Sequence, residues 1–374
     1  MHPDKQLSAR AYAARLVEDH QTKKTRLRSI ALIIPAYNES LVLAHTITTA
    51  MAAGLDKRDI FVVDDSSSDG TSRIAKDILG KHNVMRVRRS GKGLAIDKIT
   101  KGLQLTKRYR WIHIADADGE FDTRYFTELR NHLRVKNAAA TGYVASLQGG
   151  YISKYRTFEY AIGMDIIRRF QSIARVITII PGPTSIFRND IFETLHFDDK
   201  ALCEDFDVTL QIHRRSLGSI QFIPSAIART QDPVTFKDFI KQITRWNRGV
   251  LQMLYKHRIG RRTSRIDVYL SYQVMQNLLF FLMYCIWIPF ITMTTGSFAY
   301  LALAFLADVT LFFGFTLFAA SRSRQYDIIA AFPLVYALRW VSLYIFIKSF
   351  VEVAIFGKHR QARGVWETVA RHAQ

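Results

Sequence analysis

The sequence predicts an α/β domain followed by C-terminal transmembrane helices, and two observations carry this expectation. From residue 30 onward, short apolar runs alternate with helical stretches, which is the pattern of parallel βαβ units. Between residues 270 and 357 the chain is almost continuously apolar, whereas most of its charge lies in residues 1–265. A chain of 374 residues has room for one core domain and an appended membrane element.

The first two βαβ units follow one another directly. Residues 30–40 (IALIIPAYNES) predict a strand and turn, followed by a helical run through Met51. Residues 60–70 (IFVVDDSSSDG) repeat the pattern, with a helical run to Gly80. A third unit has a helix at 91–105 and a strand at 110–120 that ends in acidic residues.

Polar residues follow each of these strands. In an open parallel sheet, ligands bind beyond the carboxyl ends of the strands. The residues at these strand ends are Asn38, Asp64, Asp65, Asp116 and Asp118. We therefore expect them to converge on one crevice.

The domain organisation follows from composition. The chain divides into a basic N-terminal segment (1–29), the α/β domain (30–265), a transmembrane region (266–357) and a basic tail (358–374). The net charge of +20 could indicate nucleic acid, but many bases flank the apolar stretches, as at 256–265. No nucleic-acid-binding module is visible, so the expected partners are membrane lipids and not nucleic acid.

Two transmembrane spans are predicted at about 270–295 and 297–320, since the first lacks Asp, Glu, Lys and Arg and the second carries only Asp308. A third, at 328–357, is interrupted by charges that each cost at least about 2.5 kcal/mol at mid-bilayer. The positive-inside rule places the head, the loop at 321–327 and the tail in the cytoplasm, which three crossings cannot satisfy. Either the last segment re-enters or the rule fails at the tail.

Asp116 and Asp118 form a D-x-D pair after an apolar strand. Alternate residues of an extended chain project the same way, so both carboxylates can approach one hard cation. Such a cation would neutralise a diphosphate leaving group. For an isolated D-x-D, a solvated strand end is the alternative interpretation.

Three further motifs point to the same chemistry. Lys92 lies between two glycines, where backbone and ammonium can meet a phosphate, although an exposed turn explains it equally well. Glu204 and Asp205 open a helical stretch, either as a general base for a sugar hydroxyl or as first-turn acids of a helix.

One helix face carries Gln242, Arg245 and Trp246. The ring of Trp246 offers a flat surface to a sugar, and the guanidinium of Arg245 can donate two hydrogen bonds to a phosphate. The alternative is an interfacial helix that anchors at lipid headgroups, and one helix can do both.

In this order, the motifs resemble the family 2 glycosyltransferases with the GT-A fold. The resemblance is closest to the membrane-integrated branch that includes cellulose, hyaluronan and poly-N-acetylglucosamine synthases. It covers residue 30 to about 260, and the tail sequence GVWETVAR is also similar to that branch.

The resemblance implies a role for each motif. Nucleotide-sugar contacts would come from Pro35, Tyr37, Glu39, Asp65, Lys92, Asp116 and Arg245. Acceptor contacts would come from Gly182, Pro183, Thr184, Gln242 and Trp246, within an acceptor side and interfacial helices at 130–265. Asp116 and Asp118 would bind Mg²⁺ or Mn²⁺, and Asp205, with Glu204 beside it, would be the catalytic base.

The implied reaction is inverting transfer of a hexose or N-acetylhexosamine from a UDP-sugar to a glycan or lipid-linked acceptor. It would form a β-linkage in polysaccharide biosynthesis, on the cytoplasmic side of a multi-pass plasma-membrane protein. A homo-oligomer or an export partner stays open. The chain departs from the branch at Cys203, where Thr is common, and in having no transmembrane segment before the head.

Three other functions remain as alternatives. A related enzyme could add a single sugar to make a glycolipid. A polyprenyl-phosphate glycosyltransferase is disfavoured, because the cluster of Gln242, Arg245 and Trp246 would then have no acceptor to hold. From another class, a non-catalytic membrane transporter or scaffold would use Asp308, Arg339 and Lys348 to line a pathway.

Overall fold

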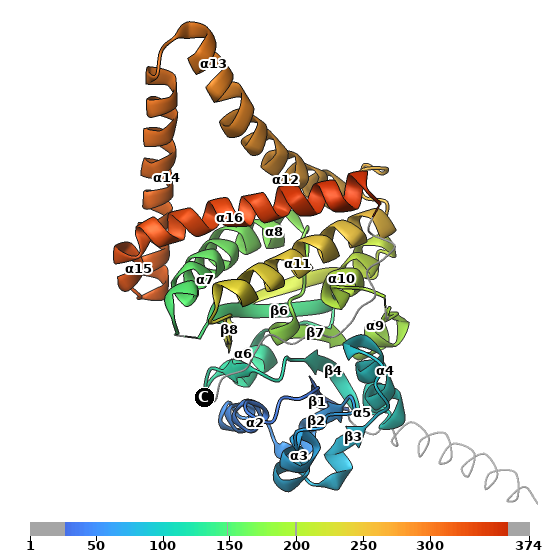
Figure 1. Cartoon of the computed structure of the whole chain (residues 1–374). Coiled ribbons are helices and arrows are strands. Elements are labelled where there is room, and N and C mark those ends of the chain that lie inside the picture. The colour runs from blue at the N-terminus through green and yellow to red at the C-terminus, as the bar shows by residue number, and fades with distance from the viewer. Residues whose placement is uncertain (1–26, 148, 199, 358–374) are drawn as a thin grey trace, which may run out of the picture.

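The computed structural model of the protein describes residues 27–147, 149–198 and 200–357. The basic tail expected at 358–374, with its GVWETVAR motif, lies outside these residues, as does the basic N-terminal segment except for residues 27–29. The described chain forms an α/β domain from which a pair of long helices projects (Figure 1).

An eight-stranded sheet in the order β3-β2-β1-β4-β7-β6-β8-β5 forms the centre of the domain. Its strands are β1 (Arg28–Ala36), β2 (Ile60–Asp64), β3 (Val84–Arg86), β4 (Tyr109–Ile114), β5 (Gly119–Phe121), β6 (Asn137–Ser146), β7 (Ser185–Arg188) and β8 (Ser219–Thr230). The strands β3, β2, β1 and β4 are parallel, as the βαβ pattern predicts. The other half is mixed, since β7 and β5 pair antiparallel with their neighbours while β6 and β8 are parallel.

Strand β1 explains why the parallel half is visible in the sequence. Ile30, Leu32 and Ile34 enter one hydrophobic core, and Ala31 and Ile33 enter another on the opposite face of the sheet. The helices around these cores are α2 (Leu43–Ala52), α3 (Thr71–Leu79), α4 (Lys92–Gly102), α5 (Leu105–Arg108), α6 (Tyr125–His132), α9 (Asn189–Thr194) and α10 (Glu204–Arg214). Because both faces are covered, the strand is a continuous apolar run.

Two helices form a layer between the sheet and the three apolar helical stretches at 265–295, 299–323 and 332–355, which are called the membrane-side helices below (Figure 1). One is α7 (Tyr151–Ile162), which continues through a π-helical stretch (Gly163–Arg168) into α8 (Arg169–Ala174). The other is α11 (Phe236–Lys256), which carries the Gln242, Arg245 and Trp246 motif.

Three helical stretches that follow are long and apolar enough to cross a membrane: Arg265–Thr295, Ala299–Ser323 and Phe332–Ile355. The first comprises α12 (Arg265–Leu282), a π-helical turn (Met283–Trp287) and α13 (Ile288–Thr295). The second is α14 (Ala299–Ser323). The third is α16 (Phe332–Phe350) with the π-helical Val351–Ile355, and the short α15 (Asp327–Ala330) precedes it. The first two form a hairpin that turns at Gly296, whose φ is 66°. Figure 1 shows α16 running beside α11 and across the foot of this hairpin.

Side-chain contacts join α16 and the π-helical stretch after it to the domain and to α14. Tyr155 of α7 donates a hydrogen bond to Ser342 at 3.0 Å, and Arg248 of α11 forms an ion pair with Glu352. Arg339 donates to both oxygens of Asp308 on α14, at 2.9 and 2.8 Å. One hydrophobic cluster contains residues of α7, α11, α14 and α16, so the membrane-side helices and the domain share a core.

Candidate active site

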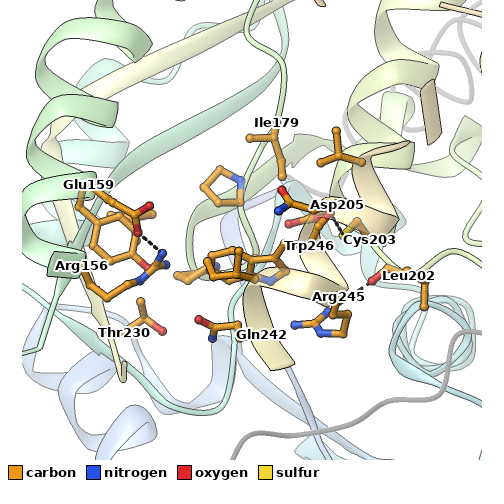
Figure 2. Close-up of a pocket in the computed structure, with 18 of the residues that line it drawn as sticks. Arg156, Glu159, Ile179, Leu202, Cys203, Asp205, Thr230, Gln242, Arg245 and Trp246 are labelled. Carbon is orange, nitrogen blue, oxygen red and sulfur yellow. Dashed lines mark hydrogen bonds and ion pairs between the residues drawn. The ribbon is translucent and has the colours of Figure 1, made fainter. Parts of the chain in front are cut away.

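A cavity of about 860 Å³ opens between the carboxyl end of β4, the start of α10, α11 and the membrane-side helices. It brings together most of the residues predicted from sequence. Those that line it are Lys92, Asp116, Asp118, Gly182, Pro183, Glu204, Asp205, Gln242, Arg245 and Trp246. Figure 2 shows Asp205, Trp246, Arg245 and Gln242 grouped in this cavity.

Seven predicted residues do not line the cavity: Pro35, Tyr37, Asn38, Glu39, Asp64, Asp65 and Thr184. Of the five strand-end residues expected in one crevice, only Asp116 and Asp118 therefore line it. Pro35 is in β1 and Tyr37 directly follows it, with the Arg89 guanidinium 3.2 Å from the centroid of the tyrosine ring. Glu39 and Thr184 are buried, and the Thr184 hydroxyl lies 3.0 Å from that of Thr141. Their contacts with a ligand stay predictions.

Asp65 has a clear structural role at the sheet edge. Its carboxylate is buried and accepts hydrogen bonds from the backbone N–H groups of Ser90 at 2.8 Å and Gly91 at 2.9 Å. Gly91 has a φ of 87°, a left-handed value that suits glycine, and precedes the first residue of α4. Asp65 therefore holds the turn that delivers Lys92 into the cavity.

Lys92 lies between two acidic motifs. Its ammonium is 2.8 Å from Asp116 Oδ1 and 2.6 Å from Glu204 Oε1. Burial acts against the charge, but these two carboxylates hold the pKa of Lys92 well above its usual range. The Lys92 ammonium thus joins Asp116, after the end of β4, to Glu204, at the start of α10.

Asp116 and Asp118 both line the cavity after β4. Gly182 leaves room for the Asp116 carboxylate, because a Cβ at this position would lie 2.5 Å from its Oδ2. No group of three or more His, Cys, Asp or Glu side chains within the described ranges is placed to hold a metal ion. Two carboxylates nevertheless suit Mg²⁺, which commonly takes one or two from the protein and the rest of its ligands from phosphate and water.

Asp205 has a raised pKa at the start of α10. It lies in the first turn of α10 and accepts a hydrogen bond from the backbone N–H of Phe206 at 2.8 Å. Burial and the adjacent Glu204 carboxylate raise the pKa of Asp205 to about 7, and the Lys92 ammonium opposes them. A base with a pKa near working pH combines availability with driving force for proton transfer.

A close helix contact places α11 against the start of α10. A Cβ on Gly249 would overlap the Cys203 Sγ, so glycine is required for this approach. Arg245 is held there by its Nη1, which donates to the Leu202 carbonyl at 3.3 Å. Cys203, the departure from the usual Thr, is buried beside this contact and leaves Asp205 in place.

Part of the cavity wall was not predicted from sequence. Figure 2 shows Arg156 and Glu159 of α7 facing the Trp246 side of the cavity. Other unpredicted polar residues in the lining include Tyr160, Arg168, Gln276, Asn277 and Ser342. Two signals were available: the spacing of Arg156, Glu159 and Tyr160 on one helix face, and the polar pair Gln276–Asn277 in an apolar segment.

The residues proposed for a transport pathway do not form one line. Asp308 and Arg339 pair with each other, and the Tyr336 hydroxyl donates to Asp308 at 2.7 Å. Arg339 lines the cavity, whereas Asp308 and the exposed Lys348 do not. The pair therefore compensates two charges inside an apolar region, which accounts for their presence.

Comparisons with known proteins show what the chain is similar to. The family described as Glycosyltransferase like family 2 matches residues 28–249. The poly-beta-1,6-N-acetyl-D-glucosamine synthase of Staphylococcus epidermidis (strain RP62A) is 22% identical over 356 residues, which cover 90% of this chain and 85% of that protein. The synthase of the same name from Staphylococcus aureus (strain COL) is 24% identical over 249 residues, 65% of this chain and 60% of that protein.

A solved structure is similar in fold. It is that of the mannosyltransferase PcManGT from Pyrobaculum calidifontis in complex with GDP-Man and Mn²⁺. The TM-score is 0.58 at 17% sequence identity, and the match covers 88% of this chain and 96% of that one.

Proposed function

Since the chain belongs to the glycosyltransferase-like family 2, we propose that it is an inverting transferase that moves a sugar from a UDP-sugar to a glycan acceptor at a membrane. One observation carries this proposal. A single cavity contains the D-x-D pair, Lys92, the raised-pKa Asp205 and the cluster of Gln242, Arg245 and Trp246. Each group has a distinct task in such a transfer.

The reaction is a single displacement. Asp205 accepts the proton of the acceptor hydroxyl as that oxygen attacks the anomeric carbon of the donor. The bond from the anomeric carbon to the diphosphate oxygen breaks, and UDP leaves with the electron pair. A β-linkage results from an α-linked donor, and no covalent sugar–enzyme intermediate forms.

The leaving group is stabilised by charge. Lys92 would exchange its contacts with Asp116 and Glu204 for the diphosphate, and the Arg245 guanidinium offers a fork to phosphate oxygens. A Mg²⁺ or Mn²⁺ ion held by Asp116 and Asp118 would supply further neutralisation of the diphosphate. The Mn²⁺ named with the structural neighbour supports this assignment.

The identity of the donor sugar and the identity of the acceptor rest on different observations. Similarity to two poly-beta-1,6-N-acetyl-D-glucosamine synthases favours an N-acetylhexosamine donor and polysaccharide synthesis. A glycolipid product is the second candidate, because Phe280, Leu343 and Phe346 of the membrane-side helices line the same cavity as Asp205. An acceptor with an apolar tail could reach the base from the membrane.

The direct test is UDP or GDP release by the detergent-purified protein, using a panel of UDP-hexoses, UDP-N-acetylhexosamines and GDP-mannose. We expect one UDP-sugar to support release with Mn²⁺ or Mg²⁺ and EDTA to abolish it. Added membrane lipid distinguishes a lipid acceptor from a glycan acceptor. If no nucleotide sugar supports release under any of these conditions, the transferase proposal is wrong.

We also propose that the membrane is crossed twice by the described chain, with the domain on the cytoplasmic side. α16 is tied to α7, α11 and α14 through Ser342, Glu352 and Arg339, and it lies across the hairpin (Figure 1). A helix held in this way lies along the membrane face instead of running beside α12 and α14. Two crossings put the domain and the 321–327 loop on one side, in agreement with the positive-inside rule.

This topology predicts a labelling pattern in sealed vesicles. In a background without the two native cysteines, Tyr326→Cys and a C-terminal tag should be reached from the cytoplasmic side, and Ser297→Cys from the opposite side. Tyr326 is exposed, and Ser297 lies in the turn between α13 and α14. A tag that is reached from the same side as Ser297→Cys would mean that α16 crosses the membrane.

A further inference from the structure

Arg156 places a charged group inside the protein, beside the tryptophan of the proposed acceptor side. It lies on α7, is 3% exposed and lines the cavity. Its guanidinium carbon is 4.7 Å from the centroid of the Trp246 ring, within the range of a cation–π contact. Figure 2 shows the two side chains facing each other.

The orientation of Arg156 is fixed by groups other than Trp246. Nη1 donates to Glu159 Oε2 at 2.5 Å, and Nη2 donates to the Tyr160 hydroxyl at 2.8 Å. Nε lies 3.6 Å from Asp232 Oδ1, in the segment after β8. With partners at both Nη atoms and Asp232 beside Nε, the planar guanidinium is held in one orientation. The flexible ammonium of a lysine would not be held in this way.

Arg156 keeps its positive charge at any working pH. Burial opposes the charged form, but Tyr160, Glu159 and Asp232 hold the pKa of Arg156 well above its usual range. A buried charge network of this kind is weak evidence for net stability, so a role in setting the orientation of a neighbouring group is the alternative. The feature that the network could specify is the ring that Arg156 contacts.

An acceptor sugar must use the part of the indole that Arg156 leaves uncovered. Gln242, one helical turn before Trp246 on α11, has a buried Oε1 with no hydrogen-bond partner among the described residues. A sugar hydroxyl could donate to this oxygen while the ring of the same sugar lies against Trp246. The angle of the indole then decides whether both contacts are made at once.

We propose that Arg156 is a positioning residue that holds the Trp246 indole at one angle and so fixes where the first sugar of the acceptor lies. The role in acceptor placement rests on the proposed transferase function. The contact between the two side chains does not.

A spectroscopic test addresses the contact without any sugar. The chain has five tryptophans, so the near-ultraviolet circular dichroism of Trp246 is obtained as the difference between the protein and its Trp246→Phe variant. We expect this difference to fall by at least about half in an Arg156→Met background, because the ring loses its fixed partner. An unchanged difference would overturn the proposal.

Two further variants make the test interpretable. Arg169→Met removes a half-exposed arginine of α8 that does not line the cavity, so it should leave the Trp246 signal as it is. Arg156→Lys keeps the charge but not the planar fork, and should lose an intermediate part of the signal. It also serves if Arg156→Met does not fold.

A kinetic test addresses the acceptor. With a β-1,6-linked N-acetylglucosamine oligosaccharide as the probe, Arg156→Met should raise the acceptor KM about tenfold while UDP release to water stays within about twofold. The Trp246→Phe variant should show no further rise when Arg156→Met is added, because the two act as one unit. Additive effects, or an equal loss of hydrolysis and transfer, would contradict a positioning role. Since the spectroscopic test needs no donor, its result is separable from failure of the transferase proposal itself.

Discussion

Replacing Asp205 with Asn is expected to lower the rate of sugar transfer by about 10²–10⁴-fold, the usual contribution of a general base. The amide keeps the shape of the side chain but cannot take the proton of the acceptor hydroxyl. Donor binding should remain, because Lys92, Asp116 and Asp118 are untouched. Metal-dependent UDP release and donor affinity, measured side by side, separate the two effects.

The pH profile gives the same assignment an independent check. The base must be deprotonated, so with a pKa of about 7 for Asp205 the rate should fall as the pH drops below that value. Glu204→Gln removes a neighbouring negative charge, which lowers the pKa of Asp205 and moves this acid limb to lower pH. The exposed pair of Asp97 and Lys101 offers a control, since Asp97→Asn should leave the profile in place. An unmoved limb in Glu204→Gln would remove Asp205 as its origin.

Asp116→Asn is expected to reduce metal-dependent donor turnover by at least about 100-fold, since even outer-shell partners of metal ligands are worth about 10–100-fold. The variant loses a charge that faces both the proposed cation and Lys92. Calorimetric titration of the donor, with Mn²⁺ and with EDTA, should show that the affinity gained from metal is lost. Full metal-dependent affinity in Asp116→Asn would exclude this carboxylate as a ligand.

Gly182→Ala should reproduce part of that loss without changing any charge. The new Cβ would lie 2.5 Å from Asp116 Oδ2 and 2.9 Å from Oδ1, so the carboxylate has to turn away. We expect donor affinity with Mn²⁺ to fall about tenfold. Gly163→Ala is the matched control, because nothing lies within 4 Å of a Cβ built there. Equal affinities in the two variants would show that the position of Asp116 does not matter.

The parallel half of the sheet was predictable, and the mixed half was not. Strands such as β1 are buried on both faces and are flanked by helices, so they appear in the sequence as continuous apolar runs between helical patterns. By contrast, β7 has four residues, and β6 has a register shift between Gly142 and Tyr143 in its pairing with β8. These strands are defined by partners distant in the chain, which local periodicity does not report.

The candidate site also has one part that was predictable from the sequence and one part that was not. Asp116, Asp118, Lys92 and Asp205 were predicted because their motifs occur together in one order along the chain, although each motif alone has another explanation. Arg156 and Glu159 lie in the interior of α7, where an arginine three residues before a glutamate is usually a surface pair. Only the burial of Arg156 against Trp246 distinguishes this pair from a surface pair.

The sequence by itself determined the family, the order of the acidic and basic motifs, and the existence of three long apolar stretches. Each of these depends on local periodicity or on side-chain chemistry at fixed spacing. The tertiary structure decided that α16 lies across the hairpin, that one cavity joins Asp205 to the membrane-side helices, and that Arg156 meets Trp246. These features arise where α7, α11, α14 and α16 share a core, and contacts between segments far apart in the chain leave no periodic trace in any one of them.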